Sequence, residues 1–210
     1  MSTTTDRNAS RPGGPRPPAT FIYAVLGMLV AVLLLGTGGF FWVTGSTGGP
    51  SIGGPFTLEG SNGKPVSDRD FRGKYMLVYF GYTYCPDVCP TTLNAVADAL
   101  DKLGPKANQL RPIFITVDPQ RDTPDVMKQY TGAFSPDLIG LTGTPDQISK
   151  VAQEYRVYYA KHVTGPGPND YSMDHSSIIY LMGPDGNFIA PIRADASGDE
   201  MAAAISKWVG

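Results

Sequence analysis

Residues 75–90 read YMLVYFGYTYCPDVCP and contain both cysteines of the 210-residue chain. The apolar run at 75–80 is typical of a buried strand, and apolar side chains recur at helical spacing after Pro90. Pro90 suits the first position of that helix, where its missing N–H costs nothing. Because each proline disfavours the helical conformation in the preceding residue, we expect Cys85 and Cys89 to lie outside the helix. Cys89 would then lie near the positive end of the helix dipole, which favours a thiolate.

The segments around this stretch alternate between strand and helix patterns. Apolar runs predict strands, and a hydroxyl residue at the start of a periodic segment predicts the beginning of a helix. The predicted strands lie at 56–58, 65–66, 75–80, 112–117, 138–141, 157–162, 177–182 and 187–192, and the predicted helices follow Cys89, Thr123, Thr144 and the stretch 197–200. Strands that alternate with helices and end in a hairpin plus a helix predict an α/β fold, a three-layer sandwich with helices on both faces of the sheet.

The amino-terminal quarter differs in composition. We expect a disordered arm at 1–20, which is rich in Ser, Thr, Pro and Arg. The 23 residues at 21–43 carry no charge and could cross a hydrocarbon core of about 30 Å, so they predict one transmembrane anchor. A cleaved signal peptide is the alternative, but the run is long for one and no clear cleavage site follows. A Gly/Ser/Pro linker at 44–55 and a globular domain at 56–210 complete the predicted organisation.

The distribution of charge predicts the orientation of the transmembrane anchor and argues against a nucleic-acid partner. Three arginines precede the apolar run, and the next ionisable residue after it is Glu59. The positive-inside rule therefore places the amino terminus in the cytoplasm. The predicted location is the bacterial inner membrane, with the soluble domain and its cysteines in the periplasm. The 17 basic and 19 acidic side chains form no block of like charge, which argues against a nucleic-acid partner.

The cysteine pair can form a disulfide, bind a metal, or alternate between these states. His175 is a candidate third ligand, because the loop before the strand at 177–182 is expected to lie against the loop after the strand at 75–80. Two thiolates and one imidazole suit Cu(I), and an added oxygen ligand or water would accommodate Cu(II). A closed zinc site would want a fourth strong ligand, and the sequence offers no obvious one. Met173 could offer a thioether, although a core position is the favoured interpretation.

Three stretches carry a family resemblance. They are FRGKYMLVYFGYTYCPDVCPTTL at 71–93, VDPQRDTP at 117–124 and YSMDHSS at 171–177. In this order behind one membrane anchor, they resemble the Sco (SenC) family of copper chaperones for cytochrome c oxidase. The resemblance extends over essentially the whole domain, from Pro55 to Trp208.

This resemblance implies a thioredoxin-like fold around a central mixed β-sheet. It implies that copper, as Cu(I) or Cu(II), is held by Cys85, Cys89 and His175. It also implies delivery of copper to the binuclear site in subunit two of cytochrome c oxidase, with a separate protein as the upstream copper donor. Asp118 matches a family aspartate placed near the metal site.

Asp118 and Asp174 each have a functional and a purely structural interpretation. Asp118 could hydrogen-bond the metal site or contact the partner protein, or it could cap the turn that follows it. Asp174 could orient His175 or simply be solvated. His162 is expected at the surface. Tyr84 stands where relatives often carry histidine, which removes one possible extra ligand.

Two functions would use these residues differently. A metal-delivery protein, which is not an enzyme, hands copper to an acceptor by ligand exchange. A thiol-disulfide oxidoreductase would use Cys85 and Cys89 to reduce the acceptor's cysteines, and both roles can coexist. A peroxidase is disfavoured by the position of Thr83, and a permanent disulfide would close too short a loop to constrain the unfolded chain much. We therefore expect copper delivery, with thiol reduction as the alternative.

Overall fold

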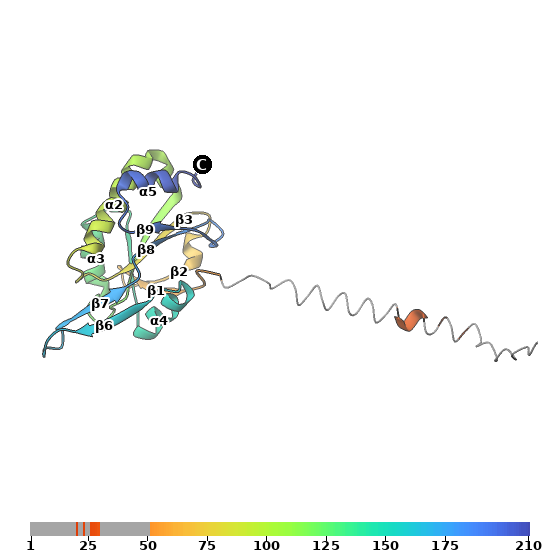
Figure 1. The fold of residues 1–210 in the computed structure, drawn as a ribbon, viewed down its shortest axis with the longest axis horizontal. Helices are drawn as coiled ribbons and strands as arrows, with labels where there is room; N and C mark the ends of the chain where they lie inside the picture. Colours follow the sequence, from red (N-terminus) through yellow and green to blue (C-terminus); the bar gives the residue numbers. More distant parts are fainter. Residues whose placement is uncertain (1–19, 21–22, 24–25, 30–50) are drawn as a thin grey trace, which may run out of the picture. The chain divides into compact units, whose positions relative to one another are not determined.

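The computed structural model describes residues 51–210 and a few residues between Thr20 and Leu29 (Figure 1). The predicted arm at 1–20 and anchor at 21–43 therefore lie almost entirely outside the described residues, as does most of the predicted linker. Among the residues that are described, no helix is both long and apolar enough to cross a membrane.

A mixed β-sheet forms the centre of the domain (Figure 1). Its strands are β1 (Thr57–Gly60), β2 (Pro65–Ser67), β3 (Tyr75–Gly81), β4 (Leu110–Thr116), β5 (Ile139–Thr142), β8 (Ile178–Met182) and β9 (Phe188–Arg193). The strand order is β2-β1-β5-β4-β3-β8-β9, with β3, β4 and β5 parallel to one another and the other neighbours antiparallel. The prediction of an α/β fold around a mixed sheet is confirmed.

Helices connect the strands much as the sequence predicts. They are α2 (Val88–Leu103), α3 (Pro124–Gly132), α4 (Pro145–Glu154) and α5 (Gly198–Ile205), with 3-10 turns η1 (Asp68–Phe71) and η2 (Gly104–Gln109). Helices α3, α4 and α5 each begin after a hydroxyl residue whose side chain accepts a backbone N–H of the first turn: Thr123, Thr144 and Ser197. The starts of α3 and α4 were predicted at these residues, whereas α5 begins within the stretch 197–200 that the predicted helix was expected to follow.

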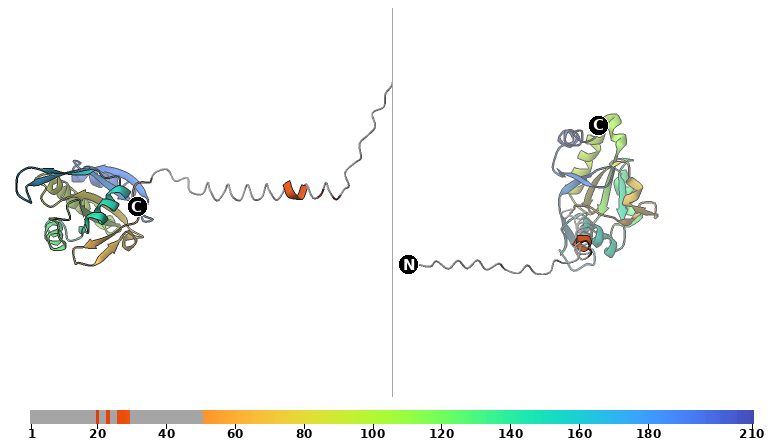
Figure 2. Two further views of the ribbon diagram at one scale, coloured as in Figure 1. Left: turned by 90° about the horizontal axis from the view of Figure 1, so that it is seen from below. Right: turned by 90° about the vertical axis from the view of Figure 1, so that its right-hand side faces the viewer.

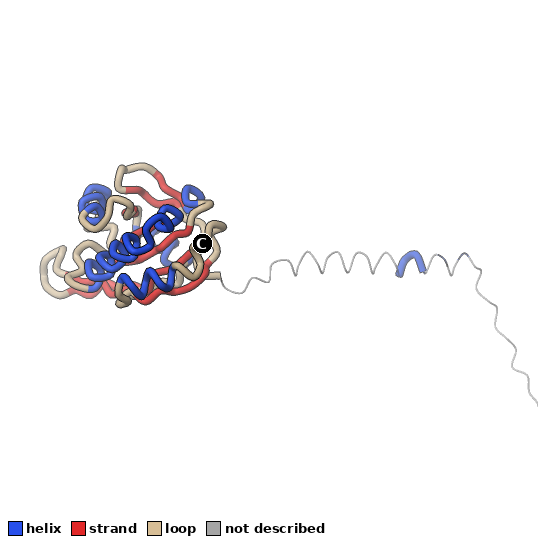
Figure 3. Tube along the Cα trace, turned by 90° about the horizontal axis from the view of Figure 1, so that it is seen from above, coloured by secondary structure: helices blue, strands red, loops and turns tan. Residues whose placement is uncertain are grey.

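Helices cover both faces of the sheet (Figure 3). On one face, Tyr79 of β3 contacts α2, and Phe114 of β4 packs against Tyr130 of α3. Helix α5 packs against α2 on this face. Phe80 points the other way, because successive side chains of a strand alternate, and it packs against Tyr155 at the end of α4. The predicted three layers are therefore present.

A two-stranded hairpin extends from the body of the domain (Figures 1 and 2). It consists of β6 (Tyr159–Val163) and β7 (Tyr171–His175), which pair antiparallel with Tyr159 opposite His175. The first strand was predicted, whereas residues 171–175 were expected to form a loop. Their strand conformation comes from pairing with β6, a partner that the short polar pattern YSMDH does not reveal.

The described end of the predicted linker packs on the domain. The Gly53 N–H donates a hydrogen bond of 2.8 Å to the Glu154 carbonyl, and Ile52 packs against the core. Ordered contacts with the domain therefore begin before the predicted boundary at residue 56.

Candidate metal centre

Neighbouring strands bring the three candidate ligands together. β3 leads into the cysteine loop and pairs antiparallel with β8, so the end of β3 lies beside the start of β8. His175 ends β7, just ahead of β8. The ligand atoms of Cys85, Cys89 and His175 all lie within 4.8 Å of one another, and the Cys89 sulfur is 3.4 Å from Nε2 of His175. The expected approach of the two loops is therefore observed.

The helix after the cysteine loop begins earlier than predicted. α2 starts at Val88 with Asp87 as its N-cap residue, so Cys89 lies in the first helical turn. The prediction that Pro90 is the first helical residue, with Cys89 outside the helix, was wrong. The whole first turn tolerates proline, because its N–H groups have no partner within the helix. One of these N–H groups, that of Cys89, faces the Cys85 sulfur at 3.4 Å.

The two thiols have opposite protonation preferences. Hydrogen bonding from the Cys89 thiol, together with His175 and the N–H groups of Cys89 and Asp87, lowers the pKa of Cys85 to about 3 despite partial burial. The hydrogen bond to Cys85 and complete burial raise the pKa of Cys89. The thiolate therefore belongs to Cys85 and not, as the sequence analysis expected, to Cys89. The helix start acts through N–H groups that face Cys85, while the Cys89 side chain is enclosed.

The His175 ring is held with one nitrogen toward the thiols. Its Nδ1 lies 3.1 Å from the Ser176 carbonyl oxygen, and because that oxygen only accepts, this contact assigns the proton to Nδ1. When the ring is neutral, Nε2 then has a free lone pair on the side of Cys89. The rings of Tyr79 and Tyr82 pack edge-on against the imidazole at centroid distances of 6.0 and 6.1 Å. A neutral imidazole in this orientation is the form that binds a metal.

A surface hollow opens over the candidate ligands. Its walls include Tyr82, Tyr158 and Met173 as well as Cys85 and His175. Cys85 is partly exposed at this hollow, whereas Cys89 is not accessible. Met173 is 8% exposed and belongs to the core. A molecule that enters the hollow therefore meets Cys85 before Cys89.

Asp118 lies in a buried ion pair. Its carboxylate pairs with Arg121 and accepts a hydrogen bond of 2.8 Å from the Tyr171 hydroxyl. Only 3% of its side chain is exposed. This carboxylate, which the sequence analysis considered as a metal-site group, a partner contact or a turn cap, thus contacts the beginning of β7.

Asp174 lies on the exposed side of the hairpin. Its carboxylate is 2.8 Å from Nε2 of His162, and more than half of each side chain is exposed. Asp174 and His175 are adjacent on a strand, so their side chains point to opposite faces. His162 is at the surface, as expected, and the group next to Nδ1 of His175 is the Ser176 carbonyl.

A buried carboxylate that the sequence analysis did not single out holds the cysteine loop. Asp122 is fully buried and accepts hydrogen bonds from the N–H of Thr83 (3.0 Å), its hydroxyl (2.6 Å) and the hydroxyl of Thr116 (2.6 Å). Burial raises the pKa of Asp122. The stretch VDPQRDTP at 117–124 contains both Asp122 and Arg121, and it was the available sequence signal for them.

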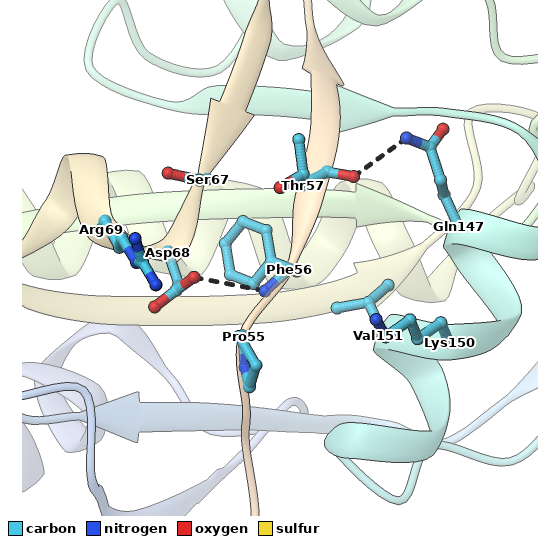
Figure 4. A pocket seen from close by; sticks show the side chains of 9 residues that line it. All are labelled: Pro55, Phe56, Thr57, Ser67, Asp68, Arg69, Gln147, Lys150 and Val151. Atoms are coloured by element: carbon cyan, nitrogen blue, oxygen red, sulfur yellow. Dashed lines mark hydrogen bonds between the residues drawn. The ribbon is translucent and has the colours of Figure 1, made fainter.

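Within the described residues, Cys85, Cys89 and His175 are the one group of three or more Cys, His or acidic side chains close enough to hold an ion. A second hollow lies between β1, η1 and α4 (Figure 4). It is lined by Pro55, Phe56, Thr57, Ser67, Asp68, Arg69, Gln147, Lys150 and Val151. No cysteine or histidine is among these residues, so this hollow offers no soft ligand for a metal.

Comparison with known proteins gives the family. A family model described as SCO1/SenC matches residues 44–210. The chain belongs to the SCO1/SenC family. Protein SenC of Rhodobacter capsulatus is 43% identical over 185 residues, which are 86% of this chain and 83% of SenC. The mitochondrial protein SCO1 homolog of Mus musculus is 43% identical over 167 residues, 77% of this chain and 57% of that protein.

Solved SCO1/SenC structures share the fold. The structure of Bradyrhizobium japonicum ScoI with copper bound matches with a TM-score of 0.69 at 46% identity, over 75% of this chain and 99% of that one. The predicted family and thioredoxin-like fold are thereby confirmed. The chain spans about half the length of the mitochondrial relatives it matches. Two thiols and an imidazole form the kind of soft donor set that copper prefers, so the residues present fit this metal.

Proposed function

We propose that this SCO1/SenC chain is a copper-binding chaperone, not an enzyme, that delivers copper to the binuclear site in subunit two of cytochrome c oxidase during assembly. The observation that carries the proposal is the cluster of Cys85, Cys89 and His175, with the Cys89 sulfur 3.4 Å from Nε2. These donors suit Cu(I) directly, and Cu(II) with an added oxygen ligand. The copper-bound structure of a relative that is 46% identical supports the choice of metal.

Copper is the cargo in this proposal, so the site must also release it. Cys85 lies partly exposed at the open hollow, whereas Cys89 is enclosed. An incoming acceptor thiolate would therefore displace Cys85 first, and the enclosed Cys89 would leave last. Each new bond to the acceptor replaces one bond to the chaperone, so the cargo is never free in solution.

Thiol reduction is the second candidate function, and the two free cysteines favour it. The Cys85 thiolate would attack an acceptor disulfide, form a mixed disulfide and release one acceptor thiolate. Cys89, on losing its proton, would then attack Cys85 and release the second acceptor thiolate. The acceptor gains two electrons, and this chain ends with a Cys85–Cys89 disulfide. The same residues would then prepare the acceptor for copper.

The proposal includes a location and partners. Residues 21–43 would anchor the chain in the bacterial inner membrane, behind a cytoplasmic arm at 1–20, with the linker at 44–55 carrying the copper domain in the periplasm. The apolar composition of 21–43 and the preceding arginines support this arrangement. A separate protein would supply the copper.

A transfer experiment separates the two functions. Copper-loaded full chain is mixed with the copper-free binuclear domain of oxidase subunit two, with the acceptor cysteines reduced in one sample and oxidised in another. Delivery predicts that copper appears on the reduced acceptor, and that His175→Ala transfers none. The chain's other histidine provides the matched control, His162→Ala, which should transfer normally. Copper that stays on the loaded chain in the presence of reduced acceptor would contradict delivery.

The oxidised acceptor tests the alternative. If reduction is the function, copper-free His175→Ala still reduces the acceptor disulfide, because it keeps both thiols, while Cys85→Ser does not. An oxidised acceptor that is left unchanged by the reduced parent would exclude this second role.

A further inference from the structure

Arg121 makes a set of contacts that copper binding itself does not require. Its side chain is only 6% exposed, and its Nε pairs with the Asp118 carboxylate. Its Nη1 donates to the backbone carbonyls of Tyr171, at 3.0 Å, and Asn169, at 3.3 Å. The Tyr171 hydroxyl donates in turn to Asp118, so each of the three residues contacts the other two. Arg121 thus binds the beginning of β7 directly through backbone carbonyls and indirectly, through Asp118, by the Tyr171 hydroxyl.

Tyrosine rings pack against the guanidinium of Arg121. Its central carbon lies 3.6 Å from the centroid of the Tyr171 ring and 4.6 Å from that of Tyr84. Nη2 has no hydrogen-bond partner among the described residues. The cation–π attraction to the tyrosine rings therefore stabilises this part of the buried guanidinium in place of a hydrogen bond. The ammonium of Lys161 lies 3.6 Å from the Tyr171 centroid as well. Tyr171 is therefore held by two cations.

These contacts connect the two segments that carry the candidate ligands. Tyr84 directly precedes Cys85, and Tyr171 begins the strand that ends at His175. Resting on the copper site proposed above, we propose that Arg121 is a positioning residue that keeps the His175 hairpin against the cysteine loop, so that the three donors are assembled before copper arrives. Groups that orient metal ligands from outside the coordination shell raise metal affinity in this way.

Arginine is suited to this position in a way that lysine is not. Its planar group donates from several nitrogens in fixed directions and stacks on aromatic rings, whereas a lysine ammonium is a single point charge. Arg121→Lys therefore keeps the charge opposite Asp118 and loses the backbone bonds and the stacking. Tyr171→Phe is a milder change, because it keeps the ring and removes only the hydrogen bond to Asp118.

The matched control is an arginine that pairs with a largely buried aspartate elsewhere. Arg72 bonds to Asp68 at 3.0 Å, and the pair contacts neither the cysteine loop nor β7 in the described structure. Arg72→Lys makes the same chemical change there. Because the Arg72 side chain is 48% exposed, this variant tests whether exchanging an arginine beside a buried aspartate is enough by itself to change copper binding.

The experiment measures Cu(I) affinity of the full chain against a competing chelator, and amide hydrogen exchange of residues 171–175 without metal. We expect Arg121→Lys to weaken Cu(I) binding by about 10- to 100-fold and to accelerate exchange in β7. Tyr171→Phe should change both in the same direction by less, and Arg72→Lys should change neither. Parent-like affinity and exchange in Arg121→Lys, or equal losses in both lysine variants, would overturn the proposal. Failure of the parent to bind copper would instead contradict the proposed function, and the exchange of β7 would still test the role of Arg121.

Discussion

Two chemically identical side chains, Cys85 and Cys89, acquire different roles from their surroundings. Cys85 is partly exposed and accepts hydrogen bonds from the start of α2, while Cys89, in the first turn of α2, is buried against β3. A helix dipole alone predicted the thiolate on Cys89, because the sequence shows its position on the helix but not the direction of the N–H groups. The structure shows that these groups face Cys85.

This difference predicts a distinct alkylation pattern. With its pKa lowered to about 3, Cys85 is a thiolate throughout the range from weakly acidic to neutral pH. In the reduced, metal-free chain, iodoacetamide should therefore modify Cys85 at a nearly constant rate between about pH 5 and pH 8. Over the same range, the rate for an ordinary thiol with a pKa of about 8.5 rises roughly tenfold for each pH unit. Peptide mass spectrometry identifies the modified cysteine. A steep rise of the Cys85 rate with pH, or earlier labelling of Cys89, would contradict this assignment.

Gly81 leaves the space that the Cys89 sulfur occupies. A Cβ at this position would lie 2.7 Å from that sulfur and 2.7 Å from the Phe114 ring. We expect Gly81→Ala to lower the free energy of unfolding by about 1–3 kcal/mol, the usual cost of overpacking, and to weaken Cu(I) binding by displacing the sulfur. Denaturant unfolding and copper titration measure the two effects. Gly132→Ala is the control, because nothing lies within 4 Å of its added Cβ. Equal behaviour of the two variants would show that Cys89 has room to move.

At the scale of helices and strands, local sequence predicts most elements and misses those that depend on distant partners. Apolar runs identify β3, β4 and β8, and hydroxyl caps identify the starts of α3 and α4. β7 is short and polar, and only its pairing with β6 makes it a strand. The start of α2 was misplaced because proline is permitted anywhere in a first turn.

The residues of the candidate site likewise fall into those that the sequence predicts and those that depend on distant contacts. Cys85, Cys89 and His175 were candidates from residue type, spacing and strand order, and the family resemblance implied them as the ligand set. Arg121 and Asp118 are neighbours in the sequence, but Tyr171, which contacts both of them, lies 50 positions from Arg121 and 53 from Asp118. No local pattern reports such a distant contact, although all three residues lie in the stretches that carry the family resemblance.

The cap of α5 provides a test at this scale that leaves the site untouched. Ser197 accepts the Glu200 N–H, and the Glu200 carboxylate accepts the Ser197 N–H at 2.8 Å, so each side chain satisfies the other's backbone group. Ser197→Ala should lower the free energy of unfolding by about 1 kcal/mol and leave copper affinity unchanged. Urea titration measures the first and chelator competition the second. Ser206→Ala, beyond the helix end, should change neither, and equal stability of the two variants would refute the role of the cap.

For the whole domain, sheet topology explains why the ligands converge. Parallel strands β3 and β4 end at the same edge of the sheet, where connecting loops gather, and α2 starts there. The antiparallel pairing of β3 with β8 brings the residues before β8 to that edge. This convergence was predictable from strand order, while the hairpin that delivers His175 was not.

Asp122 couples this edge to the stability of the domain. Burial raises its pKa above the ordinary value of 3.8, so the folded chain binds this proton more tightly than the unfolded chain. Ionisation of Asp122 therefore lowers the free energy of unfolding as pH rises from 3.8 toward the raised pKa. Asp122→Asn removes this contribution, so the stability of the parent relative to the variant should fall as pH rises through that window. Denaturant unfolding at several pH values measures the difference, with exposed Asp125→Asn as the control. A difference that grows with pH would contradict the sign.

Anaerobic titration of the reduced full chain with Cu(I), against a competing chelator, decides whether Cys85, Cys89 and His175 form a copper site. We predict one tight equivalent per chain in the parent and in His162→Ala. We predict strong loss of binding in Cys85→Ser, Cys89→Ser and His175→Ala. Absence of tight binding in the fully reduced parent, or tight binding that survives His175→Ala, would contradict the copper site and leave the cysteine pair as a redox couple.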